Sequence, residues 1–215
     1  DALNRVTKLT YPEDINSSRK ELIPAYNTAG ALESVNFDGT DYVKHIAYNA
    51  KGQRLLIAYG NNVMTRYVYD SKTFRLARMK SEKYTYCSVG QTHTYAYNAG
   101  TTRQDNAYEY DLNGNILKIK NRTPDCGLSG TPDQLDRLFS YDPINRLLSA
   151  TGRESDSQSS NQQWSDPPQG SYDPSACQAY TRNYSYDKMG NIQTLIQTGT
   201  NGFTRAFDYN TGVNT

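Results

Sequence analysis

Aromatic side chains recur two residues apart at many points along the chain. The pairs are Tyr67/Tyr69, Tyr84/Tyr86, Tyr108/Tyr110, Phe139/Tyr141, Tyr184/Tyr186 and Phe207/Tyr209. A spacing of two places both rings on one face of a β-strand. Short runs rich in branched residues follow some of these pairs, and they have the length of a strand, as at residues 191–196. The pattern predicts an all-β chain.

A five-residue motif, Tyr-[Asp/Asn]-x-x-Gly, stands between many of the predicted strands. Asp or Asn followed three residues later by Gly is typical of a type I turn, and a left-handed residue after it gives a common hairpin loop with a bulge. Asn tolerates the left-handed conformation and replaces Gly in one copy. The motif therefore predicts stacked β-hairpins in one long curved sheet, in which tyrosines form a ladder and glycines hold the turns. The expected structural repeat residues are Tyr26, Gly30, Tyr48, Gly52, Tyr69, Asp70, Tyr110, Asp111, Gly114, Tyr141, Asp142, Asn145, Tyr186, Asp187 and Gly190.

Two segments interrupt the repeats. Residues 153–178 are dense in Ser, Gln, Asn, Asp and Pro, which predicts a long exposed polar loop. Residues 131–134 read Thr-Pro-Asp-Gln, a pattern typical of a helix start, and predict one short helix. We expect a single repeat region over residues 1–215, with the polar loop inside it.

Composition narrows the classes of function. The 215 residues are only 36% hydrophobic, with a mean hydropathy of −0.83, but include 19 tyrosines, which suit the surface of a sheet. A net charge of +1 gives no electrostatic reason to expect nucleic acid or an anionic membrane as partner. No apolar run is long enough to span a bilayer. The pairing of Cys87, Cys126 and Cys177 stays open between three free thiols and a Cys126–Cys177 bridge.

Candidate chemistry is sparse. His45 and His93 have no neighbours at metal-ligand or catalytic spacing, and each repeat offers one Asp where calcium needs six to eight oxygens. We therefore expect no catalytic residue, no metal and no cofactor. The exposed faces of tyrosines suit the stacking of sugars as well as packing within a sheet.

The repeated motif and two longer segments carry a family resemblance. Residues 104–116 read QDNAYEYDLNGNI, and residues 141–154 read YDPINRLLSATGRE. With the Tyr-Asp-x-x-Gly units, these segments resemble the YD-repeat, or RHS-repeat, family, and most closely the B and C components of insecticidal toxin complexes (Tc toxins) of bacteria. The resemblance implies a β-sheet strip wound into a hollow shell around a toxic polypeptide, in a secreted protein. It also implies partners: other YD-repeat segments of the same or a partner subunit, and the enclosed polypeptide.

Two hypotheses of different classes follow. The first is a non-catalytic segment of a toxin shell that encloses and helps to deliver a toxic polypeptide, and it includes the expectation that the chain is a fragment of a longer protein. The alternative is a cell-surface adhesion or carbohydrate-binding YD-repeat module. An enzyme would need activity that depends on His45, His93 or an acidic residue.

Overall fold

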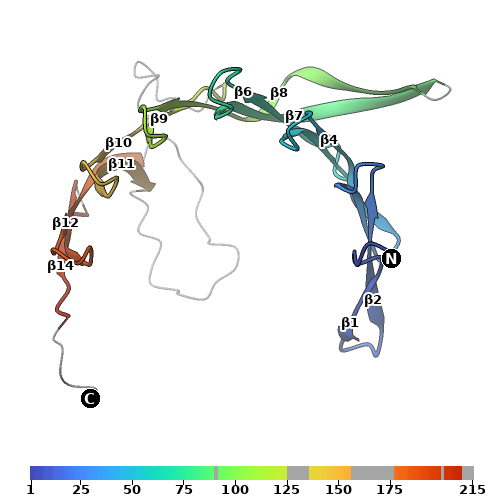
Figure 1. Ribbon diagram of the computed structural model, residues 1–215, viewed down its shortest axis with the longest axis horizontal. Helices are drawn as coiled ribbons and strands as arrows, with labels where there is room; N and C mark the ends of the chain where they lie inside the picture. The colour runs from blue at the N-terminus through green and yellow to red at the C-terminus, as the bar shows by residue number, and fades with distance from the viewer. Residues whose placement is uncertain (90–91, 125–135, 156–176, 200, 210–215) are drawn as a thin grey trace. The chain divides into compact units, whose positions relative to one another are not determined.

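The protein is all-β, as the spacing of its aromatic residues predicts. The computed structural model describes residues 1–89, 92–124, 136–155, 177–199 and 201–209, and within these ranges it contains strands and turns but no helix (Figure 1). The strands are β1 (Leu9–Glu13), β2 (Arg19–Tyr26), β3 (Leu32–Phe37), β4 (Thr40–Tyr48), β5 (Arg54–Tyr59), β6 (Val63–Tyr69), β7 (Leu76–Val89), β8 (Thr92–Tyr110), β9 (Ile116–Asn121), β10 (Arg137–Tyr141), β11 (Leu147–Ser155), β12 (Cys177–Tyr186), β13 (Ile192–Thr198) and β14 (Phe203–Ala206).

The strands follow one another across a 14-stranded sheet in chain order, from β1 to β14. The pairs from β1–β2 to β6–β7 and from β8–β9 to β13–β14 are antiparallel. The stacked hairpins that the motif predicts are therefore confirmed. Because antiparallel strands reverse direction at each step, the turns after even-numbered strands share one edge of the sheet within each unit.

The chain divides into two compact units, Asp1–Asp105 and Asn106–Thr215. In the first unit, Ala58, Met64 and Tyr84 form a small buried cluster, and Leu56 and Tyr95 pack against it. Ile46 and Ile57 are also buried. In the second unit Gln197 is 4% exposed, and the buried hydrophobic side chains of the described residues all belong to the first unit. The repeats therefore rely on contacts between neighbouring strands more than on a thick core.

A two-stranded extension explains where the buried cluster forms. The β6–β7 pairing ends at Val63↔Lys83, and β7 continues beyond it alongside β8 (Figure 1). We call residues 84–89 and 94–100 the β7–β8 arm. Its first residue, Tyr84, donates its backbone N–H to the Asn62 carbonyl at 3.0 Å and its hydroxyl to the Tyr59 carbonyl at 2.9 Å. Tyr84 thus closes over the β5–β6 turn.

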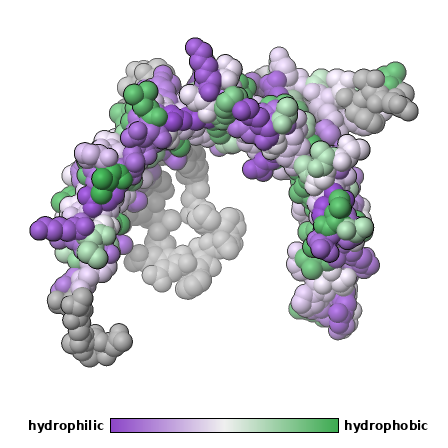
Figure 2. Space-filling model, viewed as in Figure 1, coloured by the Kyte–Doolittle hydropathy of each residue, from purple (hydrophilic) through white to green (hydrophobic). Residues whose placement is uncertain are grey.

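Apolar side chains on the surface are scattered among polar ones. The visible face of the space-filling view shows both kinds interspersed (Figure 2). The most exposed apolar residues include Ile15, Leu112 and Met189, each at a turn. Single exposed apolar residues of this kind are ordinary in folded proteins.

Several expectations fall partly or wholly outside the described residues. The short helix at residues 131–134 does so, as does the Cys126–Cys177 bridge, and Cys87 is an exposed free thiol. Most of the polar loop at 153–178 lies outside as well. Its first and last residues belong to β11 and β12, where Glu154 pairs with Gln178. Among the described residues there is no helix with the length and apolar character needed to cross a bilayer.

Candidate functional site: tyrosine clasps between repeat turns

The repeat turns share one hydrogen-bond pattern. In the turn between β12 and β13, the Asp187 N–H donates to the Asn191 carbonyl at 2.9 Å, and the Gly190 N–H donates to the Asp187 carbonyl at 3.2 Å. Gly190 has a φ of +93°, in the left-handed region that side chains resist. The same pair of bonds closes the turns that start at Asn27, Asn49, Asp111 and Asp142. Their left-handed residues are Gly30, Gly52, Gly114 and Asn145.

The Asp side chain holds the turn from inside. Asp187 Oδ1 accepts the backbone N–H groups of Met189 at 2.9 Å and Asn191 at 2.8 Å, while Oδ2 accepts the Asn191 side-chain amide at 2.8 Å. These donors, the Asn191 side chain first, lower the pKa of Asp187 below its usual value. The pKa of Asp111 is lowered in the same way, chiefly by the side chain of Asn115. In both turns the carboxylate oxygens are occupied by donors of the turn itself.

The Asp142 turn adds an arginine to this arrangement. Burial raises the pKa of Asp142, but the backbone N–H and the guanidinium of Arg146 outweigh it, so that its pKa lies below the usual value. The Arg146 Nε donates to Asp142 Oδ2 at 2.6 Å. The Arg146 guanidinium also lies 4.7 Å from the ring centre of Tyr186, which brings the turn into contact with the next repeat tyrosine.

The turn that begins at Asp70 is one residue longer. Here the Asp70 N–H donates to the Arg75 carbonyl at 2.8 Å, and the left-handed residue is Phe74, with a φ of +58°. The N–H and hydroxyl of Thr73 are the main donors that lower the pKa of Asp70. A turn that begins with Asp can therefore contain one extra residue, and in this turn Phe74 adopts an unfavourable backbone conformation.

Several repeat tyrosines make a hydrogen bond to the preceding repeat. In each case the tyrosine hydroxyl donates to the backbone carbonyl of the second residue after the left-handed residue of the previous turn. We call this contact a tyrosine clasp. The clasps are Tyr26 to Val6 (2.9 Å), Tyr48 to Leu32 (2.7 Å), Tyr69 to Arg54 (3.0 Å), Tyr141 to Ile116 (3.0 Å) and Tyr186 to Leu147 (2.8 Å). Tyr110 occupies the corresponding place at the end of β8.

The clasps lie where the backbone ladder between hairpins stops. Strands β3 and β4 are in register from Phe37↔Thr40 to Val35↔Val43, and the pairing does not continue to Leu32. The Tyr48 hydroxyl takes the Leu32 carbonyl there. In β11–β12 the register ends at Ser149↔Asn183, and Tyr186 takes the Leu147 carbonyl. A clasp therefore supplies a hydrogen bond at the edge where twisted neighbouring hairpins separate.

Burial keeps some of these hydroxyls protonated. It raises the pKa of Tyr141 and of Tyr186 above the usual value, because the ionised form loses hydration. A neutral hydroxyl is required for the clasp, since a phenolate has no proton to donate. Electrostatics and hydrogen bonding therefore favour the same protonation state.

The Tyr-[Asp/Asn]-x-x-Gly motif does not predict two of the turns and tyrosine contacts seen in the structure. Asp14 and Ser17 form a repeat-type turn between β1 and β2 without a preceding tyrosine, with Ser17 at a φ of +57°. Tyr84 makes its bond to the Tyr59 carbonyl from the β7–β8 arm, outside any Tyr-Asp unit. The spacing of Asp14 and Ser17, which repeats that of the motif, is the signal that identifies the first. The second depends on where the arm packs.

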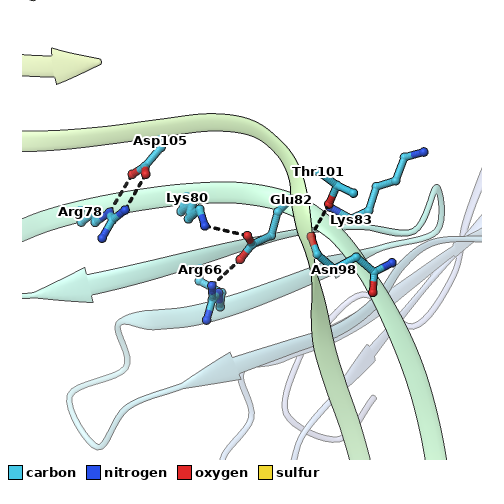
Figure 3. A network of polar contacts seen from close by, with 8 residues as sticks. All are labelled: Arg66, Arg78, Lys80, Glu82, Lys83, Asn98, Thr101 and Asp105. Atoms are coloured by element: carbon cyan, nitrogen blue, oxygen red, sulfur yellow. Dashed lines mark hydrogen bonds and ion pairs between the residues drawn. The ribbon is translucent and has the colours of Figure 1, made fainter. Parts of the chain in front are cut away.

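A network of ion pairs buries two carboxylates in the first unit (Figure 3). Glu82 is 1% exposed and pairs with Arg66 and, at 2.8 Å, with Lys80. Asp105 is 4% exposed and accepts the Arg78 Nε at 2.7 Å. These pairs link β7 to β6 and to β8, and removal of one partner would leave an uncompensated buried charge. Each is engaged by cations of the chain itself, which favours a structural role for the network.

Of the two histidines considered as catalytic candidates, the structure describes the surroundings of His45. His45 Nδ1 lies 3.6 Å from Glu33 Oε1, and the His45 ring stacks on Tyr95. The side chain of His93 lies outside the described ones. Across the part of the chain that the structure describes, no group of three His, Cys, Asp or Glu residues is placed to hold a metal ion.

No family model matches this chain. It is 33% identical to toxin subunit YenC2 of Yersinia entomophaga over 158 residues, which cover 71% of the chain and 15% of the relative. It is 32% identical to toxin subunit YenC1 of the same organism over 182 residues, or 81% of the chain and 18% of the relative. This chain is an RHS-repeat protein related to Tc toxin subunits.

The solved structures agree with this relationship. Crystal structures of TcdB2-TccC3-Cdc42 and of TcdB2-TccC3 without its hypervariable C-terminal region each match with a TM-score of 0.67 and 26% identity. Each match covers 93% of this chain, against 10% and 9% of the solved chains. The chain thus spans less than a fifth of the length of the curated relatives and about a tenth of the solved chains.

Proposed function

We propose that this chain is part of the wall of a toxin-complex shell that encloses a toxic polypeptide and helps to deliver it. In this role the chain is structural and non-catalytic, and the protein that carries it is secreted. Its partners are other YD-repeat segments, of the same or a partner subunit, and the enclosed polypeptide. The repeat residues hold the wall together: the tyrosines join successive hairpins, and the Asp, Asn and Gly residues form the turns.

The tyrosine clasp is the observation that carries the proposal. A wall must extend by adding hairpins, and each added hairpin needs a bond to the one before it. The Tyr48 clasp to Leu32 and the Tyr186 clasp to Leu147 have the same geometry in different units. A bond that repeats with the sequence motif suits a structure of indefinite length better than a single binding site. The relationship to toxin subunits supports the same role.

Protease protection in the native protein that contains this chain tests the proposal. The protein is digested under native conditions, and the surviving fragments are identified by mass spectrometry. Enclosure predicts that a polypeptide segment outside the repeats survives with the repeats intact, and that it is cut in a variant with Tyr48→Phe and Tyr141→Phe. The matched control is Tyr42→Phe, because Tyr42 is 57% exposed and makes no clasp. Enclosure would be refuted if, in wild-type protein, all segments outside the repeats were cleaved at equal rates and none was protected.

Carbohydrate binding is the second candidate, and one row of rings favours it. Tyr11 and Tyr42, 40% and 57% exposed, flank Phe37 at ring-centre distances of 5.7 and 5.6 Å in edge-to-face packing. Exposed aromatic faces suit the apolar faces of sugars. Saturable quenching of tyrosine fluorescence by an oligosaccharide, abolished by Tyr42→Ala, is expected if this candidate is right. Fluorescence that does not respond to oligosaccharides leaves the shell proposal in place.

A further inference from the structure

The residue that follows the left-handed residue of a repeat turn can contact both its own turn and the next one. Arg146 makes both contacts: its Nε donates to Asp142 Oδ2 at 2.6 Å within the turn, and its Nη1 donates to the Asp187 carbonyl of the following turn at 3.2 Å. Its guanidinium also lies 4.7 Å from the ring centre of Tyr186, the tyrosine that precedes that turn. We call a residue at this position a turn bridge when its side chain contacts the next turn.

The first turn of the chain has a bridge of the same kind in the other unit. Its left-handed residue is Asn4, with a φ of +56°, and Arg5 follows it. Arg5 Nε donates to Asp1 Oδ2 at 2.8 Å within the turn. The Arg5 guanidinium lies 4.5 Å from the ring centre of Tyr26, and its Nη1 would lie 3.3 Å from a Cβ added to Gly30 in the next turn. The same bridge is therefore built twice, at distant places in the chain.

Shorter amide side chains form a bridge where the next turn offers an acceptor nearby. Asn115 Nδ2 donates to Asp111 Oδ2 at 2.8 Å and to Asn145 Oδ1, in the next turn, at 2.7 Å. Gln53 Nε2 donates to the Phe74 carbonyl at 2.8 Å. In each case the donor directly follows a left-handed residue, and the acceptor belongs to the following repeat turn. The position of the bridge is constant, while its chemical group varies.

One pair of neighbouring turns in the described part of the first unit lacks a bridge. Ala31 occupies the bridge position between the turns that begin at Asn27 and Asn49, and a methyl group donates no hydrogen bond. The strands that meet there are β3 and β4, and their backbone ladder is short and irregular. The ladder of β5 and β6 is also short, but Gln53 bridges the turns beside it.

We propose that the bridge position determines how firmly each hairpin is held to the next, and that β3 and β4, where Ala31 stands, separate more readily than the bridged β5 and β6. Each repeat then carries one position at which the strength of its contact with the next repeat is adjusted, without a change in the turn or in the clasp. The proposal is independent of the shell role, because it concerns contacts between neighbouring hairpins within one unit.

Two substitutions in one turn remove two different bridges. Arg146→Asn keeps a donor for Asp142 within the turn, as in the other turns that pair Asp with Asn. The shorter side chain does not extend to the Asp187 carbonyl, so the bridge to the next turn is lost. Asn145→Gly keeps a residue that suits the left-handed conformation and removes the acceptor of the Asn115 bridge.

Amide hydrogen exchange, followed by mass spectrometry in the protein that contains this chain, measures both losses. Arg146→Asn should raise exchange rates in β12 about two- to tenfold, the range for a partly exposed hydrogen bond with a cation–π contact, and leave β9 within a factor of about two. Asn145→Gly should do the reverse, so each variant is the control for the other. Because Gly suits the left-handed backbone better than Asn, faster exchange in that variant reports the lost bridge.

The unbridged turn allows the converse experiment. Asn27→Asp combined with Ala31→Arg rebuilds the arrangement of Asp142 and Arg146 beside Tyr48, whose clasp matches that of the later repeat. We expect exchange in β3 and β4 to slow about two- to tenfold. The matched control is Asn27→Asp with Ala31→Met, which adds a side chain without a donor or a charge and should leave the rates within a factor of about two.

Four results would overturn the proposal. The first is unchanged exchange in β12 of Arg146→Asn or in β9 of Asn145→Gly, and the second is an equal rise in both strands in either variant, which would indicate a general loss of stability. The third is exchange in wild-type β3 and β4 that is slower than in β5 and β6. The fourth is an Ala31→Arg variant that slows exchange no more than its Ala31→Met control, and this comparison decides the matter if a variant of the later turn does not fold.

Discussion

Removing one clasp hydroxyl tests whether the tyrosines join successive hairpins. Tyr48 is well suited, because its hydroxyl lies 2.7 Å from the Leu32 carbonyl in a partly buried setting. Tyr48→Phe deletes only the oxygen and leaves the ring in place. The backbone pairing of β3 and β4 stops at Val35↔Val43, so the clasp is the hydrogen bond that continues the contact toward the turn edge.

The magnitude follows from the exposure of the site. A hydrogen bond to a backbone carbonyl contributes about 0.5–1.5 kcal/mol net, and leaving a fully buried acceptor unpaired costs about 1–3 kcal/mol. Because the Tyr48 hydroxyl is only partly buried, water replaces part of the lost bond. We therefore expect a loss of about 1–1.5 kcal/mol in the free energy of opening between β3 and β4. This corresponds to a factor of about five to twelve in the opening equilibrium.

Amide hydrogen exchange of β3 and β4 measures this loss directly. In Tyr48→Phe, peptides across these strands should exchange about five to twelve times faster than in wild-type protein, under conditions in which exchange reports the opening equilibrium. Tyr42→Phe, on the same strand but 57% exposed, should leave the rates within a factor of about two. Peptides from β12 and β13 serve as an internal reference. Equal rates in Tyr48→Phe and Tyr42→Phe would show that the clasp contributes nothing to the joining of hairpins.

Three further predictions concern the turns, the strands and the titrating groups. Gly60→Ala should cost about 2–3 kcal/mol in unfolding free energy or prevent folding, because an added Cβ would lie 1.7 Å from the Asp41 carbonyl oxygen. Gly52→Ala, with nothing within 4 Å but a φ of +75°, should cost only about 1 kcal/mol, and equal urea midpoints for the two variants would contradict the close contact. The ionised side chain of Asp187, whose pKa is lowered in the fold, stabilises the protein above about pH 4, and this contribution should disappear as pH falls through the folded-state pKa. Asp187→Asn, which keeps Oδ1, should therefore show a weaker dependence of stability on acid pH in urea unfolding. The raised pKa of Tyr186 has the opposite effect on the pH dependence of stability. The neutral hydroxyl contributes fully to the free energy of unfolding below about pH 10, and this contribution should be lost as pH rises through the folded-state pKa. Tyr186→Phe should therefore have a flatter alkaline stability profile, and an unchanged profile would rule out a contribution from this hydroxyl.

Much of the fold is encoded in short stretches of sequence. The backbone bonds that close the Asp187 turn and the bonds of the Asp187 side chain lie within five consecutive residues, from Asp187 to Asn191. Because the turn type, its left-handed residue and the direction of the next strand are decided locally, the motif alone predicts hairpins in chain order. The spacing of two between aromatic residues then predicts which side chains share a face.

The longer turn at Asp70 marks the limit of such local reasoning. The motif places a turn there but not its extra residue, and Phe74 adopts the left-handed conformation that the sequence elsewhere gives to Gly or Asn. Nothing in the identity of a phenylalanine signals that conformation. The clasp between Tyr69 and Arg54 still forms, at the same position of the repeat, despite the longer loop.

By itself, then, the sequence determined the strands, most of the repeat turns and the relationship to toxin subunits, while the tertiary structure decided what the tyrosines bind and where the chain is buried. The Tyr48 hydroxyl meets a carbonyl 16 residues away, and the Tyr186 hydroxyl meets one 39 residues away. The burial of Glu82 and the stack of His45 on Tyr95 likewise depend on the path of the β7–β8 arm. Backbone carbonyls are chemically alike in every residue, so the sequence does not indicate which carbonyl a distant hydroxyl will contact. Only the register of the assembled strands selects that carbonyl.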